Sequence, residues 1–85
     1  MMKMPEDRIN FYVSIFDVPA SAQDKDIFAA FPESYINNAF PIEGAPGGYD
    51  LQFKDRNELI KAMDCHEETI KGEKFTIAFS IIIRQ

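Results

Sequence analysis

The sequence has few of the residues that build disulfide frameworks and metal centres. It contains one cysteine, Cys65, one histidine, His66, and no tryptophan. A single cysteine cannot form an internal disulfide, and one buried thiol is typical of a reducing compartment, nuclear or cytoplasmic. A zinc site needs ligands in spaced pairs, and the chain offers no second pair, so we expect no metal and no cofactor.

Long apolar runs are also missing. A bilayer span needs about 18 consecutive apolar residues, and the longest apolar stretch, over residues 75–83, is the length of a strand. The opening MMKMPEDR lacks the apolar core of a signal peptide. We therefore expect no membrane association, and we expect residues 1–8 to form a flexible polar leader.

Basic residues are in the minority. Nine Lys and Arg stand against fourteen Asp and Glu, which gives a net charge of −5. Phosphate groups attract proteins mainly through Lys and Arg, so this balance opposes generic nucleic-acid binding, although a local basic patch can outweigh it. The 46% hydrophobic and 13% aromatic content predicts a folded globule of one domain.

No arrangement of reactive side chains points to catalysis. Cys65 and His66 are adjacent, and adjacent side chains on a helix or strand point apart, which excludes a nucleophile pair. The glycine-rich stretch over residues 44–48 lacks a following lysine and does not connect a strand to a helix, so it does not predict a phosphate site. The sequence favours a non-catalytic binding module without a small-molecule substrate.

Alternating apolar residues predict the first strand. Phe11, Val13 and Ile15 fall on one face, and Tyr12, Ser14 and Phe16 fall on the other. A helix follows near residues 24–31, with Ser21 and Asp24 as its capping pair. Pro41 predicts that the next strand, over residues 34–43, lies at an edge or contains a bulge.

The second half repeats this order. Residues 49–53 form a short strand, and Asp55 with Glu58 caps a helix whose apolar stripe contains Leu59, Ala62 and Met63. Residues 66–73 form a loop or short hairpin, and a last strand begins near residue 74. The order of the elements is strand, helix, strand, strand, helix, strand. This order predicts an α+β, ferredoxin-like βαββαβ fold over residues 9–80, with a tail over 81–85. Its four-stranded antiparallel sheet has both helices on one face, which leaves the other face for a ligand.

Four segments resemble the RNA recognition motif, or RRM, family. They are VSIFDVP (13–19), DIFAAF (26–31), PGGYDLQF (46–53) and ELIKAMDCHEETIKGEKFTIAFS (58–80). The short turn EGAPGG and the loop HEETIKG are similar to two groups within the family. One is the divergent quasi-RRM of the hnRNP F and H type, and the other is the RRM of helicase-stimulating translation initiation factors.

The resemblance implies single-stranded RNA binding, with bases stacked on outward aromatic rings of the two central strands. In this sequence the family's aromatic positions are occupied by Ser14, Gly48 and Asp50, and its leading basic position by Pro46. Each stack is worth about 1–3 kcal/mol, so the usual binding surface is expected to be lost.

Replacement contacts are available on the same face. Tyr12 and Phe16 flank Ser14, and Phe40 with Ile42 joins them on the neighbouring strand, in a patch that suits either shifted RNA stacking or a protein partner. Alternatively, Ile81 to Gln85 folds back and covers these rings.

Cations in the loops offer a second route to RNA. The candidate contact residues are therefore Tyr12, Ser14, Phe16, Phe40, Gly48, Asp50, Lys54, Arg56 and Lys74. The predicted function is single-stranded RNA binding in a divergent mode. The alternative is protein–protein interaction in an RNA-processing or translation complex.

Overall fold

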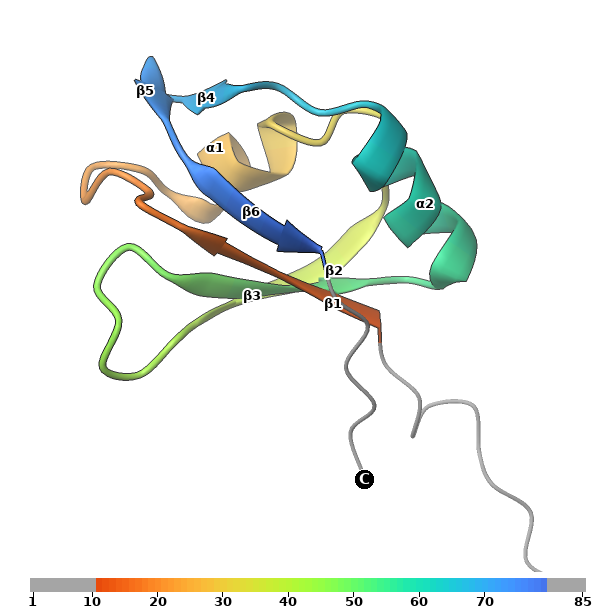
Figure 1. Cartoon of the computed structure of the whole chain (residues 1–85), viewed down its shortest axis with the longest axis horizontal. Coiled ribbons are helices and arrows are strands. Elements are labelled where there is room, and N and C mark those ends of the chain that lie inside the picture. Colours follow the sequence, from red (N-terminus) through yellow and green to blue (C-terminus); the bar gives the residue numbers. More distant parts are fainter. Residues whose placement is uncertain (1–10, 80–85) are drawn as a thin grey trace, which may run out of the picture.

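The computed structural model describes residues 11–79, and its elements follow the predicted order (Figure 1). They are β1 (Phe11–Phe16), α1 (Asp24–Ala29), β2 (Ile36–Pro41), β3 (Tyr49–Phe53), α2 (Arg56–Asp64) and β6 (Thr76–Phe79). The segment predicted as a loop or short hairpin is a hairpin of β4 (Thr69–Ile70) and β5 (Glu73–Lys74). The predicted leader over 1–8 and tail over 81–85 lie outside the described residues.

The main sheet has the strand order β2-β3-β1-β6, and all neighbouring strands are antiparallel. Both helices lie on the same side of this sheet (Figure 1). The predicted ferredoxin-like α+β fold is therefore confirmed. Neither α1 nor α2, the helices within residues 11–79, is long and apolar enough to cross a membrane.

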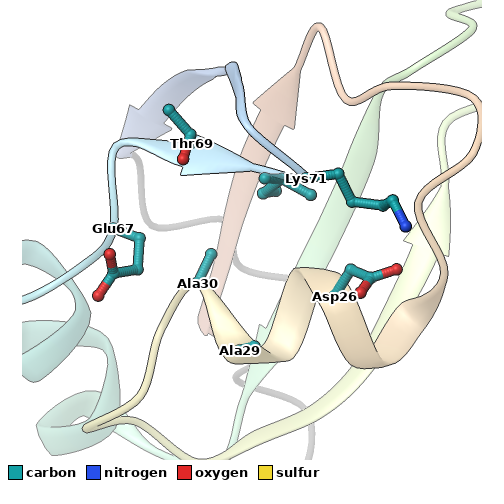
Figure 2. Close-up of a pocket in the computed structure, with 7 residues that line it drawn as sticks. Asp26, Ala29, Ala30, Glu67, Thr69 and Lys71 are labelled. Atoms are coloured by element: carbon teal, nitrogen blue, oxygen red, sulfur yellow. The ribbon is translucent and has the colours of Figure 1, made fainter.

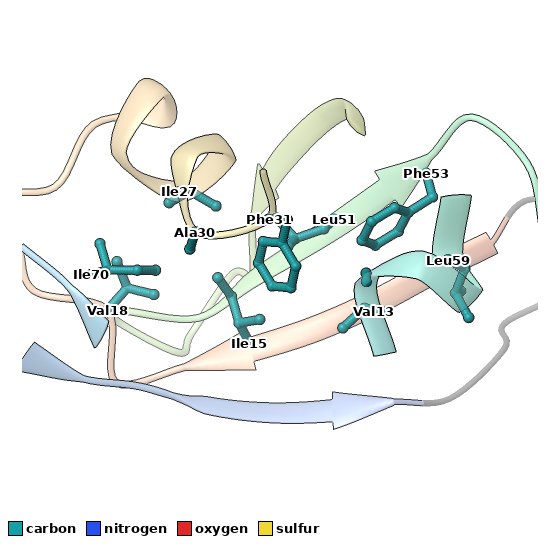
Figure 3. Packing of buried hydrophobic residues seen from close by; sticks show 11 residues of the cluster. Val13, Ile15, Val18, Ile27, Ala30, Phe31, Leu51, Phe53, Leu59 and Ile70 are labelled. Atoms are coloured by element: carbon teal, nitrogen blue, oxygen red, sulfur yellow. The ribbon is translucent and has the colours of Figure 1, made fainter. Parts of the chain in front are cut away.

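The hydrophobic core lies between the sheet and the two helices (Figure 3). Strand alternation directs one side-chain set of β1 and β3 toward the helices, as the sequence predicted. The buried cluster consists of Val13, Ile15, Val18, Ile27, Ala30, Phe31, Leu51, Phe53, Leu59, Ala62 and Ile70. This cluster lies on the helix side of the sheet, and the alternate side chains of the strands lie on the other face.

The helix starts agree only in part with the sequence analysis. At α2, the Glu58 N–H donates to Asp55 Oδ1 at 3.0 Å, which confirms the predicted cap. At α1, the predicted pairing of Ser21 with Asp24 is wrong, because the Gln23 N–H donates to Asp26 Oδ2 at 2.8 Å. The cap therefore forms two residues later than expected.

The apolar stripe of α2 is narrower than predicted. Leu59 and Ala62 are buried, whereas Met63 is 49% exposed. Leu59 and Ala62 are therefore the α2 side chains that belong to the core. Cys65, expected as a buried thiol, is exposed just beyond the helix.

The loop after β1 is held against the loop between β2 and β3. The Val18 N–H donates to the Gly47 carbonyl at 3.1 Å. Gly47 has a φ of +81°, and a Cβ at this position would lie 2.9 Å from the Val18 carbonyl oxygen. Glycine is therefore required at position 47 both by its backbone conformation and by the close approach of the neighbouring loop.

Gly47→Ala is expected to lower the free energy of unfolding by about 2–4 kcal/mol, because a left-handed backbone and a backbone collision act together. Gly44→Ala is the matched control, since Gly44 has a φ of +82° and no atom near its missing Cβ. It should lose only about 1 kcal/mol. Urea unfolding measures both values, and equal losses in the two variants would contradict the collision.

Candidate nucleic-acid interface

The side of the sheet turned away from the helices is called the open face here. Strand register places its residues in three cross-strand rows. The rows are Asn38, Gln52 and Tyr12; then Phe40, Asp50, Ser14 and Ala78; then Phe16 and Thr76. The sites predicted on β1, β2 and β3 are thus brought onto one surface.

The centre of the open face is polar. The Ser14 hydroxyl donates to Asp50 Oδ1 at 2.7 Å across the β1–β3 pair. Tyr49 is in register with Ile15 and packs against the core, so no slip of register brings its ring to the open face. Two of the positions at which the RRM family carries stacking aromatics are therefore occupied by a serine and a carboxylate that hydrogen-bond to each other.

The third such position, Gly48, has no space for a ring. A Cβ at Gly48 would lie 3.0 Å from the Ala45 carbonyl oxygen and 3.2 Å from Phe16 Cδ1. Phe16 is half-buried, and its ring lies close to the side of Gly48 where a side chain would project. Phe16 is therefore less exposed than the predicted patch requires.

Tyr12 also differs from the prediction. It faces away from the helices as expected, but only 9% of it is exposed. Its ring centroid lies 6.5 Å from that of Phe40, in a tilted arrangement of the two rings. Tyr12 therefore packs against Phe40 and exposes little surface for a ligand. The predicted covering by Ile81 to Gln85 lies outside the described residues.

The exposed aromatic surface lies instead along β2. Phe40 is 44% exposed and Tyr35, directly before β2, is 60% exposed. The Lys54 N–H donates to the Tyr35 carbonyl at 3.2 Å, one step beyond the Ile36–Phe53 pair. Since the Ile36 side chain packs on the core, alternation assigns Tyr35 and Lys54 to the open face.

Two polar contacts complete this surface. The Lys54 Nζ lies 5.7 Å from the centroid of the Tyr35 ring, within the range of a cation–π contact. Between the two exposed rings, Asn38 Nδ2 donates to Gln52 Oε1 at 3.1 Å. We call Tyr35, Asn38, Phe40, Gln52 and Lys54 the β2 surface.

The backbone of Tyr35 is anchored to α2. The Tyr35 N–H donates to Glu58 Oε1 at 2.7 Å, and the Ser34 hydroxyl donates to the Glu58 carbonyl at 2.9 Å. The other carboxylate oxygen of Glu58 accepts from Lys61 Nζ at 3.2 Å. The main chain is thus fixed while the ring is solvent-exposed, an arrangement that suits a contact residue.

The predicted cations do not form one group. Lys54 belongs to the β2 surface, and Arg56 is exposed at the first residue of α2. Lys74 is exposed on β5, next to β6, the strand at the opposite edge of the sheet from β2. Lys74 therefore lies at the opposite edge of the sheet from Lys54 and the β2 surface.

A cavity of about 350 Å³ lies on the other side of the sheet, between α1 and the β4–β5 hairpin (Figure 2). Asp26 and Lys71 lie at one end of it and Glu67 at the other, above a floor formed by Ala29 and Ala30 (Figure 2). It is separate from the open face. Among residues 11–79, no three His, Cys, Asp or Glu side chains are grouped to hold a metal ion.

Comparison with known proteins identifies a similar fold. No protein-family model matches the sequence, and no curated protein matches it. The crystal structure of the Glorund qRRM3 domain is similar to this chain, with a TM-score of 0.75 and 16% sequence identity. The match covers 85% of this chain and 95% of that one. At this identity the likeness establishes the fold: the chain has the fold of a divergent RRM domain of the quasi-RRM kind.

Proposed function

We propose that this chain is a non-catalytic module that binds single-stranded RNA on the outer strand of its sheet. The observation that carries the proposal is the pair of exposed rings on the open face, Phe40 on β2 and Tyr35 directly before it. Aromatic rings on a sheet hold bases by stacking, whatever strand presents them. Here the stacking function has moved from the two central strands to the edge.

The β2 surface supplies each type of contact that single-stranded RNA requires. Tyr35 and Phe40 stack bases, and Lys54 neutralises a phosphate. Asn38 and Gln52 carry amide groups, which can both donate to and accept from base edges. The five steps from residue 35 to residue 40 span at most about 16–17 Å, at about 3.3 Å per residue, which leaves room for a nucleotide between the two rings.

The expected affinity is weak. Two stacked bases contribute about 2–6 kcal/mol, whereas micromolar binding needs about 8 kcal/mol. Asp50, beside Phe40 in the same row, repels phosphate, as does the net charge of −5. We therefore expect a Kd of roughly tens of micromolar to millimolar at low salt, and weaker binding as salt rises.

The test is an NMR titration of the labelled domain with pools of single-stranded RNA hexamers at low and moderate salt. Saturable amide shifts at Tyr35, Asn38, Phe40 and Lys54 that decrease with salt support the proposal. Shifts confined to other surfaces, or no shift with any pool at low salt, would remove it.

Lys54→Gln is expected to reduce the slope of log Kd against log salt by about 0.7, the value for one phosphate contact on a single strand. Lys74→Gln is the matched control, because it removes the same charge from the opposite edge of the sheet. It should lower affinity slightly and leave the slope within error. Equal changes in both slopes would show that net charge, not a contact at Lys54, governs binding.

Protein binding is the second candidate function, and the exposed side of α2 favours it. Ile60 and Met63 are 42% and 49% exposed, and residues three apart are neighbours on a helix. Exposed apolar neighbours of this kind often mark a protein contact. Ile60→Asp with Met63→Asp should abolish such a contact and leave RNA shifts on the β2 surface unchanged. A nuclear or cytoplasmic location, in an RNA-processing or translation assembly, stays a prediction.

A further inference from the structure

The strand β6 forms one edge of the main sheet in the part of the chain that the structure describes. Within residues 11–79, β1 pairs with one side of β6 and no strand pairs with the other (Figure 1). In an antiparallel sheet, every second residue of an edge strand directs its N–H and C=O away from the neighbouring strand. These groups form a template on which another extended chain can be added.

The two edges of the sheet differ in how they resist such addition. Edge strands are commonly protected by proline, charge or a bulge. β2 ends in Pro41 and contains a register shift between Ile36 and Asn38. Residues 75–79, by contrast, include no proline and no charged residue. β6 is therefore the edge that can accept a strand.

A cavity of about 210 Å³ opens beside β6. Phe75 and Ile77 line it, and both side chains are half-buried and pack against the core, so the cavity is on the helix side of the sheet. A strand added to β6 would direct every second side chain to this side. An apolar side chain at such a position would enter the cavity and cover Ile77.

The charge around the cavity identifies the type of strand that fits. Glu67 and Glu68 line it together with a single lysine, Lys74. A second copy of this chain is a poor occupant, because each copy carries a net charge of −5. Pairing between two β6 strands would also join only four residues of each copy, whereas a stable interface uses about 20–30 residues a side.

We propose that the outer edge of β6 is a docking site for an extended peptide from a protein partner. The peptide pairs with β6 as a fifth strand, places an apolar side chain in the cavity beside Ile77, and places a flanking Lys or Arg near Glu67 and Glu68. Because β2 and β6 are opposite edges of the sheet, this site works independently of RNA binding on the β2 surface.

The probe is a capped heptapeptide of sequence Arg-Thr-Val-Thr-Val-Thr-Arg, which places its Arg and Val side chains on one face and its Thr side chains on the other. With labelled protein, we expect a Kd of roughly 100 μM to 1 mM, as befits a contact of this size. Amides within Thr76–Phe79 that exchange quickly in the free protein should be protected at saturation. Intermolecular NOEs between peptide and β6 backbone protons should report antiparallel or parallel pairing.

Charge reversal tests the identity of the partner. Glu67→Lys with Glu68→Lys should weaken the peptide about tenfold, because two attractive charges become repulsive. Glu33→Lys with Glu43→Lys changes the net charge equally at exposed positions away from the cavity, and should weaken the peptide less than threefold. Substituting both peptide Arg residues by Glu should abolish binding.

Three results would overturn the proposal. In the first, the β6 amides exchange at the same rate with and without saturating peptide. In the second, the Arg and Glu peptides bind equally well. In the third, the β6 amides become protected as the protein concentration rises without any peptide. The last would identify a second copy as the occupant. A Kd that is unchanged when the protein is saturated with an RNA hexamer confirms that the two edges act separately.

Discussion

Replacing both Tyr35 and Phe40 with alanine is expected to weaken single-stranded RNA binding by about 30-fold or more. The two rings are 60% and 44% exposed in the free protein, so their faces are available for stacking without rearrangement of the core. Each base–aromatic stack contributes about 1–3 kcal/mol, and about 1.4 kcal/mol corresponds to tenfold in Kd. Two losses together bring binding close to the limit of detection.

The measurement is the Kd from amide shifts or fluorescence anisotropy for one RNA hexamer, with the single variants beside the double variant. Each single variant should lose about fivefold or more. Ile60→Ala with Met63→Ala is the control, because it also removes two exposed apolar side chains, but from α2. The proposal fails if this control loses as much affinity as the double variant on β2, or if Tyr35 and Phe40 are dispensable.

Polar residues at the centre of the open face are compatible with the fold because the two faces of a strand carry different side chains. Val13 and Ile15 supply the core from the same strand that carries Ser14 on the open face. Replacing an aromatic ring by Ser14, or by Asp50, changes nothing on the helix side. Ser14 and Asp50 hydrogen-bond to each other at 2.7 Å, so these polar side chains have a hydrogen-bond partner within the open face.

The sequence was sufficient to predict the fold because each segment carried its own periodic signal. Period two in β1 placed Val13 and Ile15 on one face of the strand, and the structure buries both side chains in the core. The cap at Asp55 identified the start of α2. Ser14 and Asp50 were assigned correctly to the open face, since alternation from a buried neighbour determines the direction of each side chain.

The β2 surface was predicted only in part because alternation fails at a bulge. Phe40 and Lys54 were expected contacts, whereas Tyr35 was not. The register shift between Ile36 and Asn38 inserts one residue into β2. Alternation in steps of two residues from Phe40 therefore does not assign Tyr35 to the same face. The available signal was an aromatic residue, Tyr35, near the start of a predicted strand in which an edge position or a bulge was already expected.

Exposure was harder to predict than direction. Tyr12 and Phe16 face away from the helices as predicted, yet both are largely covered. Sequence periodicity reports the face of a strand, but neighbouring strands decide how much of a side chain is accessible. Phe16 lies beside Gly48, and Tyr12 lies beside Phe40. Both neighbours come from distant parts of the chain and depend on the β1–β3 and β2–β3 registers.

Phe31→Ala is expected to reduce the free energy of unfolding by about 3–5 kcal/mol. Phe31 is 1% exposed and makes edge-to-face contacts with Phe53 at 6.1 Å and with Phe75 at 6.2 Å. It also lies 6.0 Å from the His66 ring. It therefore connects the end of α1 to β3, to the residue before β6 and to the loop after α2, and its removal leaves a cavity that no neighbour fills.

A chain of this length is stabilised by about 4–13 kcal/mol in total, so the variant should melt roughly 12–40 °C lower or be partly unfolded at 25 °C. Thermal unfolding by circular dichroism measures the shift. Phe40→Ala is the matched control: the same ring is removed from the open face, where the loss should be under about 1 kcal/mol. Phe40→Ala should nevertheless weaken RNA binding, although the domain stays folded. If Phe40→Ala destabilises the domain as much as Phe31→Ala does, the open face is part of the structural core and cannot serve as a separate binding surface.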